Sequence, residues 1–208
     1  MSTTSNRVLS LYKSRTTMLE LLYYLEYQVE DYMGFSINEI DAMYSNSQLD
    51  MLVSHTDNRK VYVKYYLTAK QMKPAVLNDV IEDLFTIENV LTKNDTLIII
   101  TDEEPNDTIV TKMKYLYDHD GIFVVIHNIQ RLQFNILNHQ LVPECVILDD
   151  KAVEELKKKY NMKNIKQLPE ISRFDPQALA ICLRPGQVCQ FKRKSSTAMV
   201  YDYYRVCL

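Results

Sequence analysis

Apolar positions in the first two thirds of the chain alternate between helix-like and strand-like spacing. Apolar residues at three- and four-residue steps predict helices over residues 6–29, 37–44, 74–91 and 106–118. Segments that are apolar or rich in Tyr and Val predict strands over residues 49–54, 60–67, 97–100 and 122–126. The last two strands are apolar throughout, as is typical of strands covered on both faces. This alternation predicts a mixed or parallel sheet flanked by helices.

Polar residues at the helix ends support these boundaries. Asn6 is placed to cap the first helix, and Ser36 with Glu39 has the spacing of a capping box at the second. Pro74 suits the first turn of the third helix, where its missing N–H is not needed.

The last third of the chain predicts a second, smaller unit. A helix over Val153–Tyr160 is capped by Asp149 or Asp150 and ends in three lysines, which complements the helix dipole. Asp175-Pro176 opens another short helix. A turn at residues 184–187 then leads to two strands, 188–192 and 200–206, joined by a polar turn.

Charge also divides the chain. Residues 1–138 carry 12 basic and 19 acidic side chains, a net of −7, whereas residues 139–208 carry 12 and 8, a net of +4. A change of sign along a chain suggests units with different partners. The sequence therefore predicts an α/β (α+β) protein with domains at 1–137 and 138–208.

Composition narrows the class of protein. No apolar run approaches the length of a membrane span, and the first residues lack the apolar region of a secretory signal, so we expect neither. Three scattered glycines cannot build a phosphate-binding loop. The four cysteines form no Cys-x-x-Cys pair, and we interpret them as reduced, mostly buried thiols. We expect no metal or other cofactor and no small-molecule substrate in this chain.

Candidate catalytic residues are sparse. No nucleophile motif is present, and we expect no catalytic role for the four dispersed histidines. Asp50 and Lys64 lie on adjacent predicted strands as in metal-dependent nucleases, but Tyr62 occupies the second acidic position. Such a site needs two carboxylates to hold a divalent cation, so a nuclease would require Asp57 or Glu82 nearby. We expect no catalytic residues in this chain.

Short motifs in the last third occur in the order found in one family. They are Asn138–Glu144, Leu168-Pro169, Asp175-Pro176, Arg184–Val188, Arg193, Ser195–Ala198 and Tyr204-Arg205. Together they strongly resemble subunit 5 of eukaryotic DNA-directed RNA polymerases, and they are similar to its shorter counterpart in archaeal RNA polymerases. The resemblance extends more loosely to Tyr12–Leu19 and Leu49–His55, a region that the archaeal form lacks.

The resemblance implies a non-catalytic polymerase subunit. Its N-terminal domain would be a restriction-endonuclease-like jaw with a mixed sheet, placed in the lower jaw near downstream DNA. Its C-terminal two-layer α/β assembly domain would dock on the largest subunit, and magnesium chemistry would belong to the catalytic subunits. The residues implied at the subunit interface are His139, Leu141, Val142, Pro143, Asp175, Pro176, Arg184, Gly186, Gln187, Arg193, Thr197, Tyr204 and Arg205. For Asp175 and Gly186 an internal role, as helix cap and turn glycine, stands equally open.

Three positions depart from the family pattern. Cys145 replaces a histidine, and Cys182 and Met199 replace glycines, so we expect altered turn geometry there. An acidic loop at residues 102–107 makes direct DNA contact doubtful at that point, because it repels phosphate. We therefore expect DNA contact to be indirect or weak.

Two other functions remain as alternatives: a free-standing metal-dependent nuclease-like enzyme, and a transcription regulator acting off the polymerase. We expect no membrane partner. The resemblance implies an intracellular protein at sites of transcription, in the nucleus for a cellular copy, or in the virion and host cytoplasm for a large DNA virus.

Overall fold

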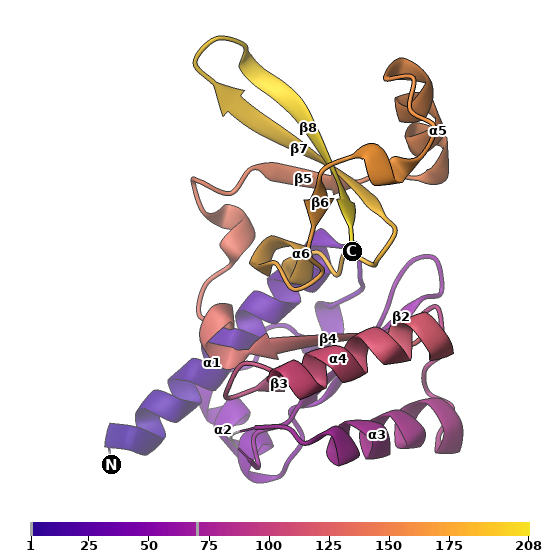
Figure 1. Ribbon diagram of the computed structural model, residues 1–208. Coiled ribbons are helices and arrows are strands. Elements are labelled where there is room, and N and C mark those ends of the chain that lie inside the picture. The colour runs from indigo at the N-terminus through magenta and orange to yellow at the C-terminus, as the bar shows by residue number, and fades with distance from the viewer. Residues whose placement is uncertain (1, 70) are drawn as a thin grey trace. The chain divides into compact units, whose positions relative to one another are not determined.

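The computed structural model describes residues 2–69 and 71–208, with side chains from residue 6 onward. The chain forms two compact units, Met1–Asn135 and Ile136–Leu208 (Figure 1). Both are mixed α/β structures with a mixed sheet, which confirms the predicted α+β class. None of the helices in the described chain combines the length and apolar character that a bilayer-spanning helix requires.

Unit 1 is built on a four-stranded sheet in the order β1-β2-β3-β4. Its strands are β1 (Met51–Ser54), β2 (Lys60–Tyr65), β3 (Thr96–Thr101) and β4 (Phe123–Asn128). β1 and β2 form the predicted antiparallel hairpin, and β2, β3 and β4 run parallel. Every residue of β3 is buried, because helices cover both faces of the central strands.

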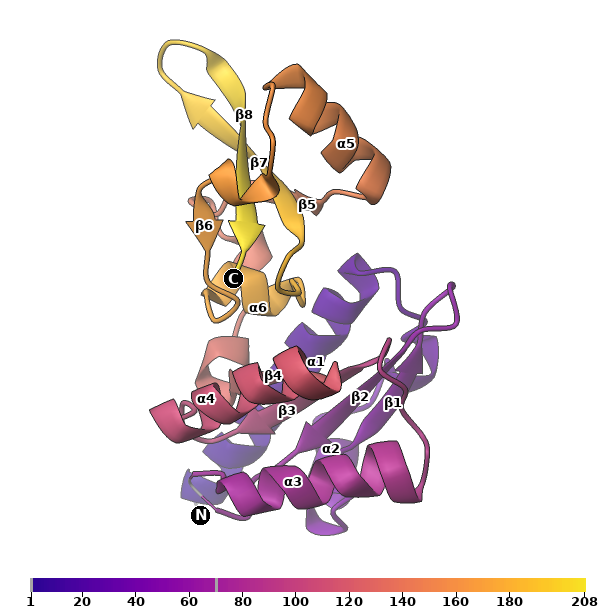
Figure 2. The same cartoon turned by 45° about the vertical axis from the view of Figure 1, so that its right-hand side comes forward.

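The helices of unit 1 lie on both faces of this sheet. They are α1 (Ser2–Tyr24), α2 (Ile37–Ser45), α3 (Pro74–Glu82) and α4 (Asp107–Tyr115). Helices α3 and α4 connect successive parallel strands and therefore cover the same face, with α1 on the other (Figure 2). Short helical turns follow α1, α3 and α4, at Glu30–Tyr32, Asp83–Ile87 and Leu116–Asp120, and another, Ile129–Leu132, follows strand β4.

Several predicted boundaries in unit 1 are wrong. Helix α1 already begins at Ser2, so Asn6 lies inside it and is not a cap. It ends at Tyr24, and Glu26 has a left-handed φ of 66°, which a continuing helix does not allow. Helix α3 ends at Glu82 and widens into a π-helical turn up to Ile87, so residues 88–91 are not helical.

The predicted capping box at α2 is confirmed. The Glu39 carboxylate accepts a hydrogen bond from the Ser36 backbone N–H at 2.7 Å, and the Ser36 hydroxyl accepts one from the Glu39 backbone N–H at 3.4 Å. These bonds satisfy two donors that would otherwise lack partners at the start of the helix. The helix begins where the sequence predicts because of these reciprocal bonds.

Unit 2 contains a second four-stranded sheet in the order β5-β7-β8-β6. Its strands are β5 (Glu144–Ile147), β6 (Glu170–Ile171), β7 (Val188–Ser195) and β8 (Met199–Cys207). The β7–β8 hairpin is the longest pairing, and it carries β5 antiparallel on one side and β6 parallel on the other. Strands β5 and β6 are short edge strands that the sequence pattern did not predict.

One face of this second sheet packs against helix α5 (Asp150–Lys159). Leu156 of α5, Val188 of β7 and Val206 of β8 form the buried centre of this layer. Asp149 is the cap, because its side chain accepts a hydrogen bond from the Ala152 N–H at 2.8 Å. The shorter helices are α6 (Pro176–Ala180) and two single turns, Ile136–Asn138 and Ile165–Gln167.

Cys182 and Met199, the two residues for which the resemblance implies glycines, have a left-handed backbone. Cys182 has a φ of 50° and Met199 a φ of 55°, both in the left-handed region. An L-residue pays about 1–2 kcal/mol there, because its Cβ approaches the neighbouring carbonyl oxygen. At both positions a left-handed backbone is therefore carried by an L-residue, which is less suited to it than glycine.

The cysteines are free thiols, and three of the four are buried: Cys145, Cys189 and Cys207. Cys182 is half-buried as a residue, but desolvation of its thiol raises its pKa to about 12, and burial raises the pKa of Cys207 to about 11. Both thiols are therefore protonated at neutral pH, and a thiol in that form is a poor nucleophile and metal ligand.

We predict that Met199→Gly stabilises the chain by about 0.5 kcal/mol. Glycine removes the penalty of about 1–2 kcal/mol that an L-residue has in the left-handed region. Part of this gain is offset, because glycine makes the unfolded chain more flexible and so loses more conformational entropy on folding. The Met199 side chain is 83% exposed, so little packing is lost. Thermal unfolding should show a higher midpoint for Met199→Gly but not for Met199→Ala, which retains the Cβ; equal midpoints for both variants would contradict the strain argument.

We predict that His127 makes the protein sensitive to acid. Burial, with the charge of Arg131 adding to it, lowers the pKa of His127 to about 4. The unfolded chain binds this proton near pH 6.5, so stability is full above that pH and falls by about 3 kcal/mol as the pH drops towards 4.

Urea unfolding of the wild type and of His127→Gln between pH 8 and pH 4 measures this effect. The free energy of unfolding of the variant should no longer fall with this steepness between pH 6.5 and 4. At pH 8 the histidine is neutral in both the folded and the unfolded state, so the difference in unfolding free energy between the two proteins at that pH reports packing alone. Parallel pH profiles for the two proteins would show that His127 does not titrate as described.

Candidate functional site

The register of the β7–β8 hairpin decides which side chains share a face. Arg193 pairs with Tyr201, Phe191 with Tyr203, and Cys189 with Arg205. Because alternate residues of a strand point to opposite faces, these six side chains lie on one face of the sheet. The intervening residues, including Tyr204, lie on the other face.

The face that carries Tyr204 is the one covered by α5. Tyr204 packs against the Leu156–Val188–Val206 core, and its ring meets that of Tyr160 edge-on at a centroid distance of 6.0 Å. Burial raises the pKa of the Tyr204 phenol. The structure therefore gives this sequence-predicted interface residue an internal packing role.

On the opposite face, two arginines lie against one tyrosine ring. The guanidinium carbon of Arg193 lies 4.5 Å from the centroid of the Tyr203 ring, and that of Arg205 lies 5.3 Å from the same centroid. A cation against an aromatic face gains roughly 0.5–2 kcal/mol, more as water is excluded. We call Arg193, Tyr203 and Arg205 the arginine–tyrosine cluster.

The cluster has hydrogen-bonding capacity that the unit itself does not use. Arg205 Nε is buried and has no hydrogen-bond partner in the described chain. A buried donor left without a partner costs about 1–3 kcal/mol. A planar acceptor such as a carboxylate matches the fork of donors that a guanidinium presents. Sequence reasoning missed Tyr203, although its strand parity with Arg205 places it beside that residue.

The turn and helix-cap residues among the predicted sites have clear internal roles. Gly186 has a φ of 87°, and its N–H donates to the Cys207 carbonyl at 2.9 Å. The Gln187 side-chain oxygen accepts a hydrogen bond from the Arg184 N–H at 2.8 Å, which closes the turn. Asp175 caps α6 by accepting from the Gln177 N–H at 2.9 Å, and Pro176 occupies the first helical position.

The predicted residues at the start of unit 2 form a tight loop. His139 Nδ1 accepts from the Leu141 N–H at 3.2 Å, and the His139 carbonyl accepts from the Val142 N–H at 2.9 Å. The Pro143 carbonyl accepts from the side chain of Gln177 at 2.7 Å. Leu141 is left 84% exposed, and Thr197, in the hairpin turn, is also exposed.

The structure also brings together the three nuclease-like positions of unit 1. One Asp50 oxygen accepts from the Tyr65 backbone N–H at 2.9 Å. The other accepts from the Tyr62 hydroxyl at 3.2 Å and lies 3.4 Å from Lys64 Nζ. Desolvation, with the neighbouring Asp50 charge second, raises the pKa of Tyr62 to about 12, so this phenol stays a proton donor.

This cluster does not have the donor set of a cation site. Both Asp50 oxygens already accept hydrogen bonds, whereas Mg²⁺ prefers oxygen ligands free to coordinate it. Asp57 lies in the turn at the other end of β1 and pairs with Arg59 at 3.1 Å. At about 3.3 Å per residue along the strand, that turn is over 10 Å from Asp50. In the described ranges, no group of three or more His, Cys, Asp or Glu side chains is arranged to hold a metal ion.

Comparison with known proteins identifies unit 2. Residues 134–207 match the family model described as RNA polymerase Rpb5, C-terminal domain. The chain is 50% identical over 74 residues to DNA-directed RNA polymerase subunit Rpo5 of Thermococcus kodakarensis, covering 36% of this chain and 89% of that protein. The same subunit of Pyrococcus abyssi is 46% identical over an equal span. These relatives are subunits of DNA-directed RNA polymerases.

A eukaryotic relative gives a similar match over less of its length. The DNA-directed RNA polymerases I, II, and III subunit RPABC1 of Caenorhabditis elegans is 43% identical over 75 residues, 36% of this chain and 35% of its own. The aligned part again has the length of unit 2. The chain belongs to the RNA polymerase Rpb5 family, as the sequence motifs predicted.

We predict that the purified chain does not cut DNA in the presence of magnesium. A single carboxylate that already accepts three donors cannot hold the cation between a phosphate and water. Incubation of supercoiled plasmid with the full chain and millimolar MgCl₂ should leave the plasmid intact. Cleavage that disappears in Asp50→Ala, with circular dichroism showing a folded variant, would contradict this prediction.

Proposed function

We propose that this chain is a non-catalytic subunit of a multisubunit DNA-directed RNA polymerase. Unit 2 docks on the largest subunit through the sheet face that carries the arginine–tyrosine cluster. Unit 1 has a restriction-endonuclease-like fold and forms part of the lower jaw beside downstream DNA. The match to the Rpb5 family supports the assignment to a polymerase, and the arginine–tyrosine cluster supports docking through this face.

The cluster has the chemistry of an interface anchor. Arginine and tyrosine are enriched among the residues that contribute most to protein–protein affinity. Within the described residues the Arg205 Nε donor has no partner, so another molecule can supply one. We therefore propose a carboxylate or backbone carbonyl of the largest subunit as the acceptor for Arg193 and Arg205.

Apolar exposure at the hairpin turn supports the same face as a docking surface. Met199 is 83% exposed and Tyr201 40%, and both lie on the face of the cluster. Exposed apolar side chains grouped on one segment favour a contact with another protein. A unit of 73 residues also has a small core, to which a partner commonly adds stability.

Unit 1 supports DNA by shape more than by charge. The acidic loop that follows β3 is partly neutralised, because Arg7 forms a two-pronged pair with Asp102 at 2.5 and 2.9 Å. Arg131 pairs with Glu104 at 2.7 Å in the same loop. These arginines are engaged within the unit, and an acidic segment does not attract phosphate. We propose weak or indirect contact with downstream duplex.

Catalysis is assigned elsewhere in the complex. We propose that the magnesium-dependent polymerisation chemistry belongs to the large subunits, and that this chain holds no cofactor or small-molecule substrate. The complex acts at intracellular sites of transcription, in the nucleus for a cellular enzyme or in the virion and host cytoplasm for a viral one.

We predict that Arg193→Glu weakens incorporation into the polymerase. Reversing a charge at a desolvated contact costs about 2–5 kcal/mol, whereas the same change at a solvated position costs almost nothing. Lys194→Glu is the matched control, because Lys194 is exposed and points to the opposite face of β7. Co-purification of the largest subunit with tagged chains measures the difference.

The expected result is a loss of at least tenfold for Arg193→Glu and normal recovery for Lys194→Glu, with both variants folded. Equal recovery of the largest subunit by both variants would remove the cluster from the interface. Recovery of other transcription proteins without the largest subunit would favour a regulator that acts off the polymerase.

A further inference from the structure

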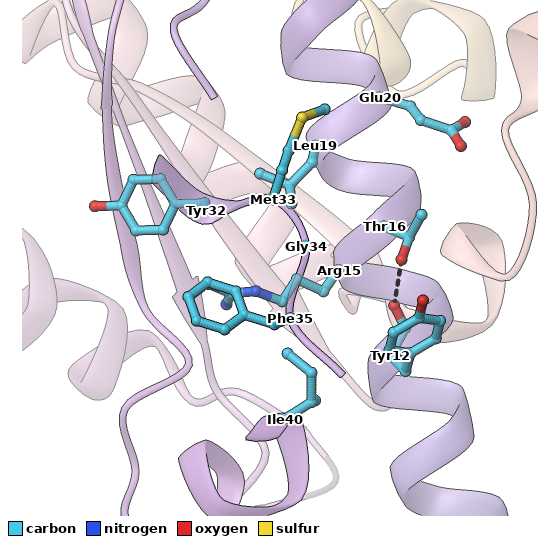
Figure 3. Close-up of a pocket in the computed structure, with 10 residues that line it drawn as sticks. All are labelled: Tyr12, Arg15, Thr16, Leu19, Glu20, Tyr32, Met33, Gly34, Phe35 and Ile40. Carbon is cyan, nitrogen blue, oxygen red and sulfur yellow. Dashed lines mark hydrogen bonds between the residues drawn. The ribbon is translucent and has the colours of Figure 1, made fainter. Parts of the chain in front are cut away.

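An open groove lies between three segments of unit 1: α1, the segment 32–35, and α2. It has a volume of about 330 Å³ and is walled by Tyr12 and Leu19 of α1, Tyr32, Met33 and Phe35 of the segment, and Ile40 of α2. Figure 3 shows these side chains around Arg15, whose side chain runs from α1 towards the Phe35 ring. The groove belongs entirely to unit 1.

Arg15 is a buried cation in this largely apolar setting. Its residue exposure is 4%, and one terminal nitrogen donates to the Leu49 carbonyl at 2.8 Å. Arg15 Nε is buried and has no hydrogen-bond partner among the described residues. Burial lowers the pKa of Arg15, but an arginine side chain stays charged at any physiological pH.

The groove supplies aromatic rings for this charge but no carboxylate. The Arg15 guanidinium carbon lies 5.9 Å from the Tyr32 centroid and 5.6 Å from that of Phe35. Glu20, the acidic residue of the lining, accepts a hydrogen bond from Asn135 at 3.1 Å instead. A buried charge is usually paired, so an unpaired guanidinium in an open groove favours an anionic partner from outside.

We propose that this groove binds a peptide segment of another protein, which inserts one acidic side chain towards Arg15 and lays an adjacent apolar side chain against Met33 and Phe35. The buried cation selects the carboxylate, and the aromatic walls select the apolar neighbour. A volume of about 330 Å³ accommodates one or two side chains, not a folded domain.

The surroundings favour a peptide over a nucleic acid. Residues around the groove expose apolar surface, with Met33 at 47% and Ile37 at 45%. Glu20 lines the groove, and the N-terminal part of the chain is acidic, so a polyphosphate backbone is repelled. One carboxylate on an otherwise neutral segment satisfies Arg15 with far less repulsion than a chain of phosphates.

Tyr32, which lines the groove, also prevents a peptide from pairing with the neighbouring edge of the sheet at Leu52. The Tyr32 hydroxyl donates to the Leu52 carbonyl at 3.0 Å and accepts from the Leu52 N–H at 3.2 Å. These are the free backbone groups of edge strand β1, so strand addition is blocked at this point. Tyr32 thereby stays fixed as a wall of the groove.

Selection from a random twelve-residue peptide display library against the full chain tests the proposal. The enriched peptides should share one Asp or Glu beside an aromatic or aliphatic residue. Changing that Asp to Asn in the best peptide should weaken binding at least tenfold by calorimetry. Its addition should shift the Arg15 Nε–Hε signal, which NMR observes directly.

Two chain variants localise the binding. Met33→Asp places an acid at the groove and should weaken binding at least tenfold, whereas Ile87→Asp adds the same charge at an exposed position of unit 1 and should change it less than twofold. Circular dichroism checks that both variants fold. Arg15 itself is left unchanged, because its substitution would disturb the core.

Peptides without an acid preference, equal binding to Met33→Asp, or no enriched peptides would each overturn the proposal. A shift of the Arg15 signal by a short DNA duplex but not by peptide would assign the groove to nucleic acid instead. The proposal is independent of docking by unit 2, because Met33→Asp should leave recovery of the largest polymerase subunit unchanged.

Discussion

The pairing register of β7 with β8 is the constraint on which unit 2 depends. It sends Val188, Tyr204 and Val206 beneath α5 and sends Arg193, Tyr203 and Arg205 to the other face. A slip of one residue would exchange the two faces and place the arginines in the apolar core. The same pairing therefore builds the core and presents the proposed docking surface. Because the buried core fixes the register, it also fixes which side chains form that surface.

Unit 1 shows a different relation between fold and chemistry. Asp50, Tyr62 and Lys64, whose strand positions resemble those of metal-dependent nucleases in the sequence, lie together in the structure. With Tyr62 donating to Asp50, the carboxylate instead links the start of β1 to the end of β2. A phenol at the second of the two positions thus gives a hydrogen-bonded link between the strands, where a second carboxylate would give a pair of metal ligands.

The sequence predicted most of the fold because its signals are local. The Ser36–Glu39 capping box, the Asp149 and Asp175 caps and the uniformly buried β3 all lie where their residues indicate. The errors occur where local signals are absent. The end of α1 depends on a left-handed glutamate, and the two-residue β6 exists only through its pairing with β8.

The sites were less predictable, because side-chain proximity follows from tertiary contacts. Motif order identified the family, and the Asp50–Tyr62 relation followed from strand spacing. The stacking of two arginines on Tyr203 required the hairpin register. Finding the Arg15 site required knowing that α1, the segment 32–35 and α2 pack together. No sequence pattern indicates that the buried Arg15 Nε lacks a hydrogen-bond partner among the described residues.

We propose that the sheet face carrying the arginine–tyrosine cluster, and not the face covered by α5, meets the largest polymerase subunit. A photo-reactive benzoylphenylalanine at Tyr201, on the cluster face, or at Glu155, exposed on α5, tests this within the assembled polymerase. We expect a covalent adduct with the largest subunit from position 201 and none from position 155. An adduct from position 155 alone would contradict it.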